Sequence, residues 1–169
     1  RTTVAVVSTL LTVVLAIGLA QLFVGLTGLT GIGSEEAYHL QTSPLGFVNL
    51  KGLLLGGIVI GALGVLDDIT TAQTWAAREI FDARPTMHFA ELFMRVMRVG
   101  REHIASLVNT LVLAYAGASF PLFLLLYATK DTQPLWVVLN SQQMAEEIVR
   151  TVVGSTALVL AVPLSSALA

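Results

Sequence analysis

Four long apolar segments constrain the fold of this chain more than any other feature. They cover residues 4–26, 45–66, 104–128 and 148–169, and the first of them contains no charged residue. A helix needs roughly 20 residues to cross about 30 Å of hydrocarbon, and each segment is long enough to do so. Backbone polar groups in lipid must be satisfied internally, so we expect each segment to be a helix. The sequence therefore predicts an all-α, polytopic transmembrane bundle with four spans.

The composition agrees with a membrane protein and excludes several other classes. Charged residues make up 12% of the chain, whereas soluble domains carry about 25%. The net charge of −2 indicates no basic surface for nucleic acid, and the absence of cysteine excludes disulfides, thiol catalysis and thiolate metal sites. No phosphate-binding glycine loop or HExxH motif occurs. We therefore expect no enzymatic activity.

The distribution of arginine predicts the orientation of the spans. The connection over residues 67–103 contains five arginines, whereas residues 27–44 contain no Lys or Arg and residues 129–147 contain only Lys130. Arginine and lysine concentrate in cytoplasmic loops. We therefore expect a multi-pass protein of the cell membrane with the 67–103 connection and both chain ends in the cytoplasm.

The cytoplasmic connection is itself predicted to be helical. Residues 69–81 continue or closely follow the second span, and the DARP stretch at residues 82–85 should end that helix. After Thr86, apolar residues recur at helical spacing, which predicts an amphipathic helix that runs into the third span. Pro121 and Pro163 should kink the third and fourth spans, and Pro121 is also expected to take part in helix packing.

The second span carries a stripe of small residues. Gly46, Gly57, Gly61, Gly64 and Asp68 fall on one face if the helix is continuous. Glycines on one face allow another helix to approach closely. The stripe is explained either by packing alone or by packing that leads to a functional polar end at Asp68.

The carboxylates at this polar end leave several chemistries open. Asp67 and Asp68 are adjacent, so they point about 100° apart on a helix and do not form a paired acid–base site by themselves. Carboxylates suit a hard cation such as Mg²⁺ or a proton relay. Because the sequence identifies no complete ligand set, both a metal and a cofactor remain unassigned.

A second polar stripe runs from the amphipathic helix into the third span. Glu91, Arg95, Arg98, Glu102 and Asn109 share one face of a continuous helix. Polar groups inside lipid are unfavourable unless they face protein or water. Hydrogen bonds between helices and a water-accessible vestibule both explain the stripe. The predicted polar pathway consists of Asp67, Asp68, Gln73, Arg101, Glu102, His103, Asn109 and Thr110.

The third connection and the start of the fourth span give local predictions. Residues 135–139, with Trp136, have the character of an interfacial segment. Asn140 and Ser141 are candidate N-caps for the following helix. Arg150 follows Glu146 and Glu147 by one turn, so pairing along the helix accounts for its charge.

Three segments resemble the YibE/F-like family of prokaryotic membrane proteins. They are residues 61–73 (GALGVLDDITTAQ), residues 100–125 (GREHIASLVNTLVLAYAGASFPLFLL) and residues 146–169 (EEIVRTVVGSTALVLAVPLSSALA). The resemblance covers residues 45–169 well and the first span loosely. Ser165 and Ser166 depart mildly from the usual family ending.

The resemblance implies a longer bacterial inner-membrane protein with further N-terminal spans. We therefore expect this chain to be its C-terminal part, a single transmembrane domain in contact with the lipid bilayer. Its partner would be the missing N-terminal part, a separate membrane subunit or a second copy of the chain. The family's conspicuous residues carry over here without assigned roles as Asp67, Asp68, Gln73, Arg101, His103, Asn109, Thr110 and Pro121.

Two functions follow from these observations. The first is a permease or channel-like transporter of a small solute or cation, because the two polar stripes are expected to converge at the cytoplasmic boundary. The second is a non-transporting accessory or assembly subunit of a larger membrane complex, because the chain offers small-residue packing surfaces. Selective flux would favour the first, and stable co-purification without ion dependence would favour the second.

Overall fold

A computed structural model describes residues 2–44, 46–129 and 133–169, and all regular structure in these ranges is helical. Three helices are long and apolar enough to cross a membrane, and a fourth candidate is a helix pair bent by 54°. This confirms the all-α membrane fold with three to four spans. The helices are α1 (Thr2–Leu26), α2 (Glu35–Thr42), α3 (Leu50–Ala83), α4 (Phe89–Ala118), α5 (Phe120–Thr129), α6 (Leu135–Leu139) and α7 (Gln142–Leu168).

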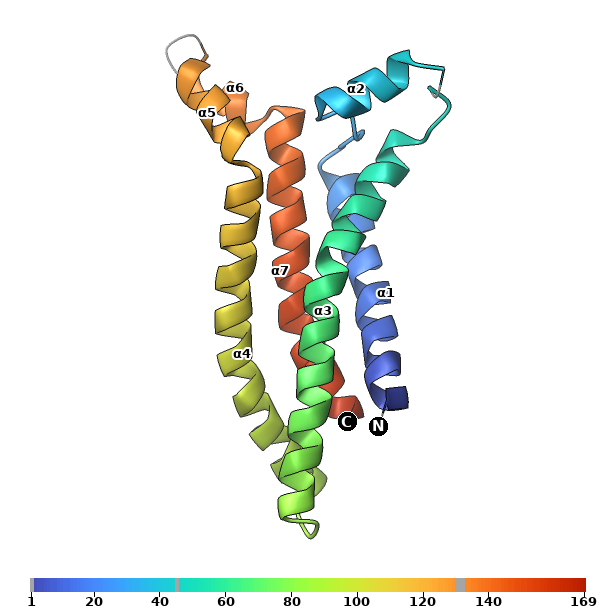
Figure 1. Ribbon diagram of the computed structural model, residues 1–169, viewed down its shortest axis with the longest axis vertical. Coiled ribbons are helices and arrows are strands. Elements are labelled where there is room, and N and C mark those ends of the chain that lie inside the picture. The colour runs from blue at the N-terminus through green and yellow to red at the C-terminus, as the bar shows by residue number, and fades with distance from the viewer. Residues whose placement is uncertain (1, 45, 130–132) are drawn as a thin grey trace.

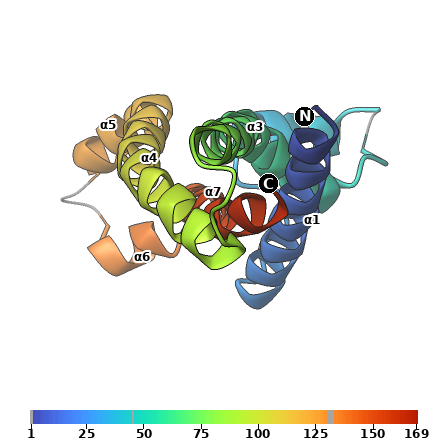
Figure 2. The same ribbon diagram turned by 90° about the horizontal axis from the view of Figure 1, so that it is seen from below.

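Helix α7 occupies the middle of the bundle, where α1, α3 and α4 all pack against it (Figures 1 and 2). Ala16 of α1 and Ala157 and Ala161 of α7 are fully buried in one cluster with Leu66 of α3. Because alanine side chains are short, the backbones of α1 and α7 can approach closely. The core of the molecule therefore lies around α7.

The two ends of the bundle differ in character. The α3–α4 turn and both chain ends lie toward the bottom of Figure 1, and we call this the arginine end because the arginines of residues 78–101 gather there. Residues 27–49 and 133–141 lie at the opposite end, which we call the loop end. Helix α3 has 34 residues, about 51 Å at 1.5 Å per residue. It therefore exceeds the roughly 30 Å of hydrocarbon, and the α3–α4 hairpin projects beyond the ends of α1 and α7 (Figure 1).

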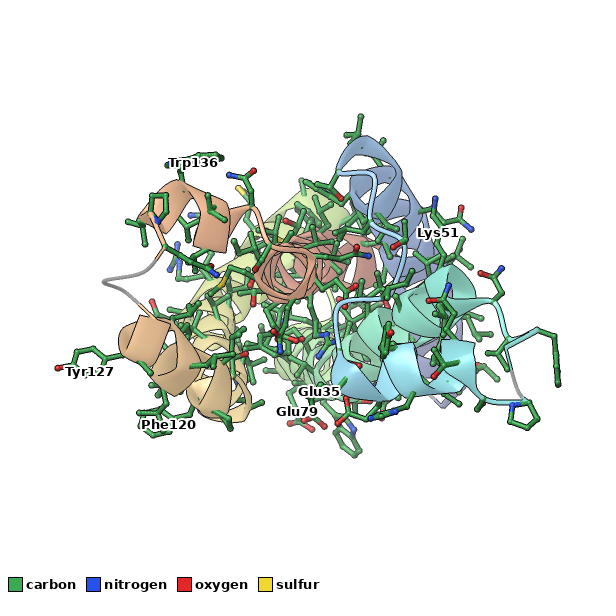
Figure 3. All side chains as sticks on the ribbon, turned by 90° about the horizontal axis from the view of Figure 1, so that it is seen from above. Glu35, Lys51, Glu79, Phe120, Tyr127 and Trp136 are labelled. Carbon is green, nitrogen blue, oxygen red and sulfur yellow. The ribbon has the colours of Figure 1, made fainter. Side chains whose placement is uncertain are left out.

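Helix α3 begins later than the sequence suggested, but it continues through residues 69–81 and ends in the DARP stretch, as one of the two predicted alternatives had it. Its first residue is Leu50 rather than residue 45, because the Asn49 side chain caps the helix by accepting the Gly52 N–H at 3.1 Å. Lys51 projects from the first turn (Figure 3). The helix then continues unbroken to Ala83, so Asp67 and Asp68 lie inside it and do not terminate it.

The amphipathic helix and the third span form one helix, α4, as the pattern predicted. The span then breaks at Ser119, where α4 meets α5 at an angle of 54°. Pro121 lies in the first turn of α5, the part of a helix in which a missing N–H is tolerated. The predicted kink near Pro121 is therefore a break two residues before it. Pro163, in contrast, lies inside the single helix α7.

Short helices cover the loop end. The sequence did not predict α2, which begins where the Ser34 hydroxyl accepts the Ala37 N–H at 3.2 Å. Trp136 of α6 points away from the bundle (Figure 3), in keeping with an interfacial position. Of the two candidate N-caps of α7, Ser141 caps the helix, because its hydroxyl accepts the Met144 N–H at 3.4 Å.

Candidate functional site

Polar side chains are buried where α1, α3 and α7 meet toward the arginine end. We call them the polar core, and its members are Ser8, Thr12, Thr70, Gln73, Ser165 and Ser166. The Ser166 hydroxyl donates to Gln73 Oε1 at 3.1 Å. Gln73 Nε2 and Ser8 Oγ are buried and have no hydrogen-bond partner among the described residues. Gln73, a predicted pathway residue, therefore retains unused hydrogen-bonding capacity.

Asp67 lies next to the polar core, on the α1 side of α3. The Thr9 hydroxyl is 3.3 Å from Asp67 Oδ1 and 2.7 Å from the Thr70 hydroxyl. Asp67 also lines a groove of about 570 Å³ between α1 and α3, together with Trp75 and Arg78. Its neighbour Asp68 is exposed on another face of α3.

The remaining predicted pathway residues lie on the outer side of α4. Arg101, Glu102, His103, Asn109 and Thr110 are all exposed. Within the described ranges, no hydrogen bond or ion pair joins them to Asp67, Asp68 or Gln73, and no group of three His, Asp or Glu residues could hold a metal ion. The structure thus does not bring the two polar stripes together, and a role for the α4 residues stays a prediction.

The predicted glycine stripe is shorter than expected, because Gly46 precedes α3, and the part on α3 is largely uncovered within this chain. A Cβ atom added at Gly57 or Gly64 would meet no atom within 4 Å, and one at Gly61 would lie 3.9 Å from the Tyr115 hydroxyl. Helix packing against Gly57 and Gly64 therefore stays a prediction that concerns a partner outside the described residues. Pro121, the other predicted packing residue, lines a cavity at the loop end.

This loop-end cavity is a second hollow that is lined by charged side chains. It has a volume of about 400 Å³ and is bounded by the loop before α2, the start of α3, the α4–α5 break and the first turns of α7. Its charged lining residues are Glu146, Glu147 and Arg150, all on α7. Ionisable groups inside a spanning helix are rare, and they mark pathways for ions or substrates. We therefore consider the loop-end cavity the candidate functional site.

The two carboxylates of the cavity have different partners. Glu147 Oε1 is 3.0 Å from Arg150 Nη1, and its other oxygen accepts the Ser119 hydroxyl at 3.1 Å. Glu146 is only 8% exposed, and its Oε1 accepts the Gly33 N–H at 3.0 Å. Glu147 thus links α7 to the α4–α5 break, whereas Glu146 links α7 to the loop that follows α1.

The same loop is held to α7 at a second point. With its side-chain amide oriented to match the surrounding donors, the Gln142 carbonyl accepts the N–H groups of Thr30, Gly31 and Ile32 at 2.9, 3.0 and 3.2 Å. Gly31 has a φ of +85°, a conformation that L side chains rarely adopt. The glycine-rich loop therefore turns its amides toward the start of α7, and we call this set of contacts the loop clamp.

The rim of the site carries further negative charge outside the spans. Glu36 lies two residues along the chain from Ser34, which lines the cavity. Hydrogen bonds from its own backbone amide and from the Ser34 hydroxyl lower the pKa of its carboxyl. Glu36 therefore stays ionised near the mouth of the cavity.

Tyr115 lies near the loop-end cavity without lining it. It precedes Ser119 by four residues, while Gly61 and Gly154 follow the lining residues Gly57 and Arg150 by four, so all three lie one turn below the cavity. A Cβ atom at Gly154 would lie 3.1 Å from the Tyr115 hydroxyl. This hydroxyl is buried and has no partner among the described residues. A polar atom with free hydrogen-bonding capacity thus lies beneath the cavity, between two glycines.

Comparison with known protein families gives the chain an identity at the level of the family. The sequence model of the family described as YibE/F-like protein matches residues 1–169, the whole length. The chain belongs to the YibE/F-like family. No curated protein and no solved structure matches it.

Sequence reasoning did not select the residues of the loop-end cavity of this YibE/F-like protein as a candidate site. The predicted pairing of Arg150 along α7 is confirmed for Glu147, but Glu146 instead faces the loop. Three charges at the start of an otherwise apolar span were a usable signal of a site. Tyr115 carried no such signal, because its place beneath the cavity depends on how α3, α4 and α7 pack.

Proposed function

We propose that this YibE/F-like protein is a permease or channel-like transporter of a small cation, and that the loop-end cavity is the entrance of its pathway. The observation that carries the proposal is the cluster of Glu146, Glu147 and Arg150 around a 400 Å³ cavity on a spanning helix. Keeping three ionisable groups at such a place is unfavourable without a function that needs them.

The charge of the cavity favours a cationic solute. Its lining has two carboxylates and one guanidinium, and the guanidinium is already paired with Glu147. A cleft lined by one sign of charge raises the local concentration of the opposite ion. We therefore favour a cation over an anion as the transported species.

The arrangement below the cavity supports a gated pathway. Beneath Tyr115, the buried side chains of Leu66 and Val162 and the adjoining Leu107 fill the space among α3, α4 and α7. Gln73 of the polar core lies beyond them, toward the arginine end. Polar regions separated by an apolar plug fit a closed state of a transporter better than a simple membrane anchor.

Ion flux into proteoliposomes tests the proposal with a panel of cations and pH gradients. Glu147→Gln should lower flux about tenfold or more, because it removes the charge of a group that makes two charge-assisted contacts. The control is Glu79→Gln, an exposed glutamate of α3. Parallel measurements on Asp68→Asn and Asn109→Leu test whether the predicted residues of the arginine end contribute.

A second function is favoured by one observation. The face of α4 with Glu102 and Asn109, together with Gly64 and Asp68 of α3, is exposed in this chain. Polar and small residues within a span suit contact with another membrane protein. Under this alternative the protein is a non-transporting accessory subunit. Folded, inserted protein that shows no flux and co-purifies with another membrane protein would support the alternative and contradict transport.

We also propose that the arginine end faces the cytoplasm of a bacterial cell. The support is the arginine-rich α3–α4 hairpin, compared with loop-end connections that carry few basic residues.

A further inference from the structure

Glu146 differs from every other carboxylate of the loop-end cavity and its rim in its burial and its surroundings. It is 8% exposed, whereas Glu35 and Glu36 at the start of α2 are exposed to solvent. Its carboxyl group packs directly on Gly33, where an added Cβ atom would lie 2.5 Å from the carboxyl carbon. Only glycine at position 33 allows this approach.

Among the described residues, Glu146 has no ion-pair partner of its own, and Arg150 of the same helix attracts it only from a longer distance. Within the described ranges, no Lys, Arg or His nitrogen lies within 4 Å of its carboxylate, because Arg150 pairs with Glu147. The α3, α4 and α5 residues that line the cavity contribute no titratable side chain, and they are Leu50, Leu53, Leu54, Gly57, Ala118, Ser119, Pro121 and Leu122. The titratable and charged groups that face Glu146 are thus Glu147 and Arg150 of its own helix, with Glu35 and Glu36 at the rim.

A buried carboxylate without an ion-pair partner of its own is unfavourable, and a proton removes this penalty without requiring further ligands. A metal ion would need several oxygen ligands, and the described residues hold no cluster of three His, Asp or Glu side chains. The cavity gives the carboxyl group a route to water. These conditions fit a group that exchanges a proton with the loop end.

We propose that Glu146 is a proton-binding site and that proton uptake there loosens the loop clamp. A hydrogen bond from Gly33 N–H to an ionised carboxylate is about twice as strong as one to a neutral carboxyl group. Protonation therefore weakens the contact between residues 27–33 and α7. In a cation transporter, this step would couple the proton to movement at the cavity; that coupling rests on the proposed function, whereas proton binding itself does not.

Hydrogen exchange followed by mass spectrometry tests this inference on the full chain in detergent. After correction for the intrinsic effect of pH, exchange at the amides of residues 30–33 should be about fivefold faster in the protonated form. Glu146→Gln should exchange like the protonated form at every pH. Glu79→Gln, which removes an exposed carboxylate of α3 far from the loop clamp, is the control and should keep the pH dependence of the wild type.

Infrared difference spectra provide a second readout that does not depend on loop motion. The carboxyl band that appears on acidification should be lost in Glu146→Gln and retained in Glu147→Gln and Glu36→Gln. An unchanged band and unchanged exchange in Glu146→Gln would overturn the inference. Neither measurement involves flux, so the two proposals can fail separately. A protein that shows no flux could still bind a proton at Glu146, and a protein that transports cations could lack this proton-binding site.

Discussion

At the scale of single residues, Gly31 explains why the chain places a glycine-rich loop directly after its first span. Its φ of +85° is combined with close contact to the next span, since an added Cβ atom would lie 2.3 Å from the backbone oxygen of Leu50. Gly28 shares the conformation, with a φ of +67°, but an added Cβ atom there would meet nothing within 4 Å. Substitution of the two glycines therefore separates the cost of the backbone conformation from the cost of close packing.

Alanine substitutions at these two glycines form a matched pair. Gly28→Ala should cost about 1–2 kcal/mol of stability, the penalty of a left-handed conformation for an L residue. Gly31→Ala should cost clearly more, because the backbone at Leu50 must also move. Unfolding by SDS titration in mixed micelles measures the difference. Equal losses for both variants would contradict the packing of the loop on α3.

At the scale of elements, the crossing of α3, α4 and α7 depends on Gly100. An added Cβ atom would lie 2.4 Å from Val162 Cγ1 and 2.9 Å from Gln73 Nε2. Gly100 of α4 is itself buried, directly against the polar core. The absence of a side chain at this position sets how closely α4 approaches its neighbours.

Gly100→Ala is therefore expected to destabilise the bundle by about 1–3 kcal/mol, the usual cost of overpacking a core. Gly56→Ala in α3 serves as the control, because its added Cβ atom would meet nothing within 4 Å. The control should be neutral or gain up to about 1 kcal/mol from improved helix propensity. Thermal unfolding in detergent, followed by circular dichroism, measures both. A Gly100→Ala protein as stable as its control would show that α4 does not pack this closely.

The helices were predictable from sequence to a much greater degree than the site. Apolar runs and helical periodicity located α1, α4 and α7, because span length and backbone hydrogen bonding leave few alternatives in lipid. The short helix α2 was missed, since an eight-residue polar helix has no comparable pattern. The pairing of Glu146 with Gly33 joins positions 113 residues apart. Such a contact depends on tertiary packing, and no local spacing encodes it.

At the scale of the whole molecule, orientation in the membrane is a testable property. The chain contains no cysteine, so each introduced thiol reports from one position only. We expect a thiol from Phe47→Cys, at an 82% exposed position of the loop end, to react with a membrane-impermeant maleimide on intact cells. A thiol from Thr86→Cys, in the α3–α4 turn, should react only after the inner membrane is opened. The reverse pattern would contradict a cytoplasmic arginine end.

The loop clamp affects which helices of the bundle can move at the loop end. Gln142 and Glu146 bind the start of α7 to the segment that follows α1. The loop-end parts of α1 and α7 are therefore connected to each other. At the loop end, α4 is joined to α7 by the hydrogen bond between Ser119 and Glu147, beside the break that leads into α5. While the loop clamp is closed, a wider cavity would therefore require displacement of α4 and α5 rather than separation of α1 from α7.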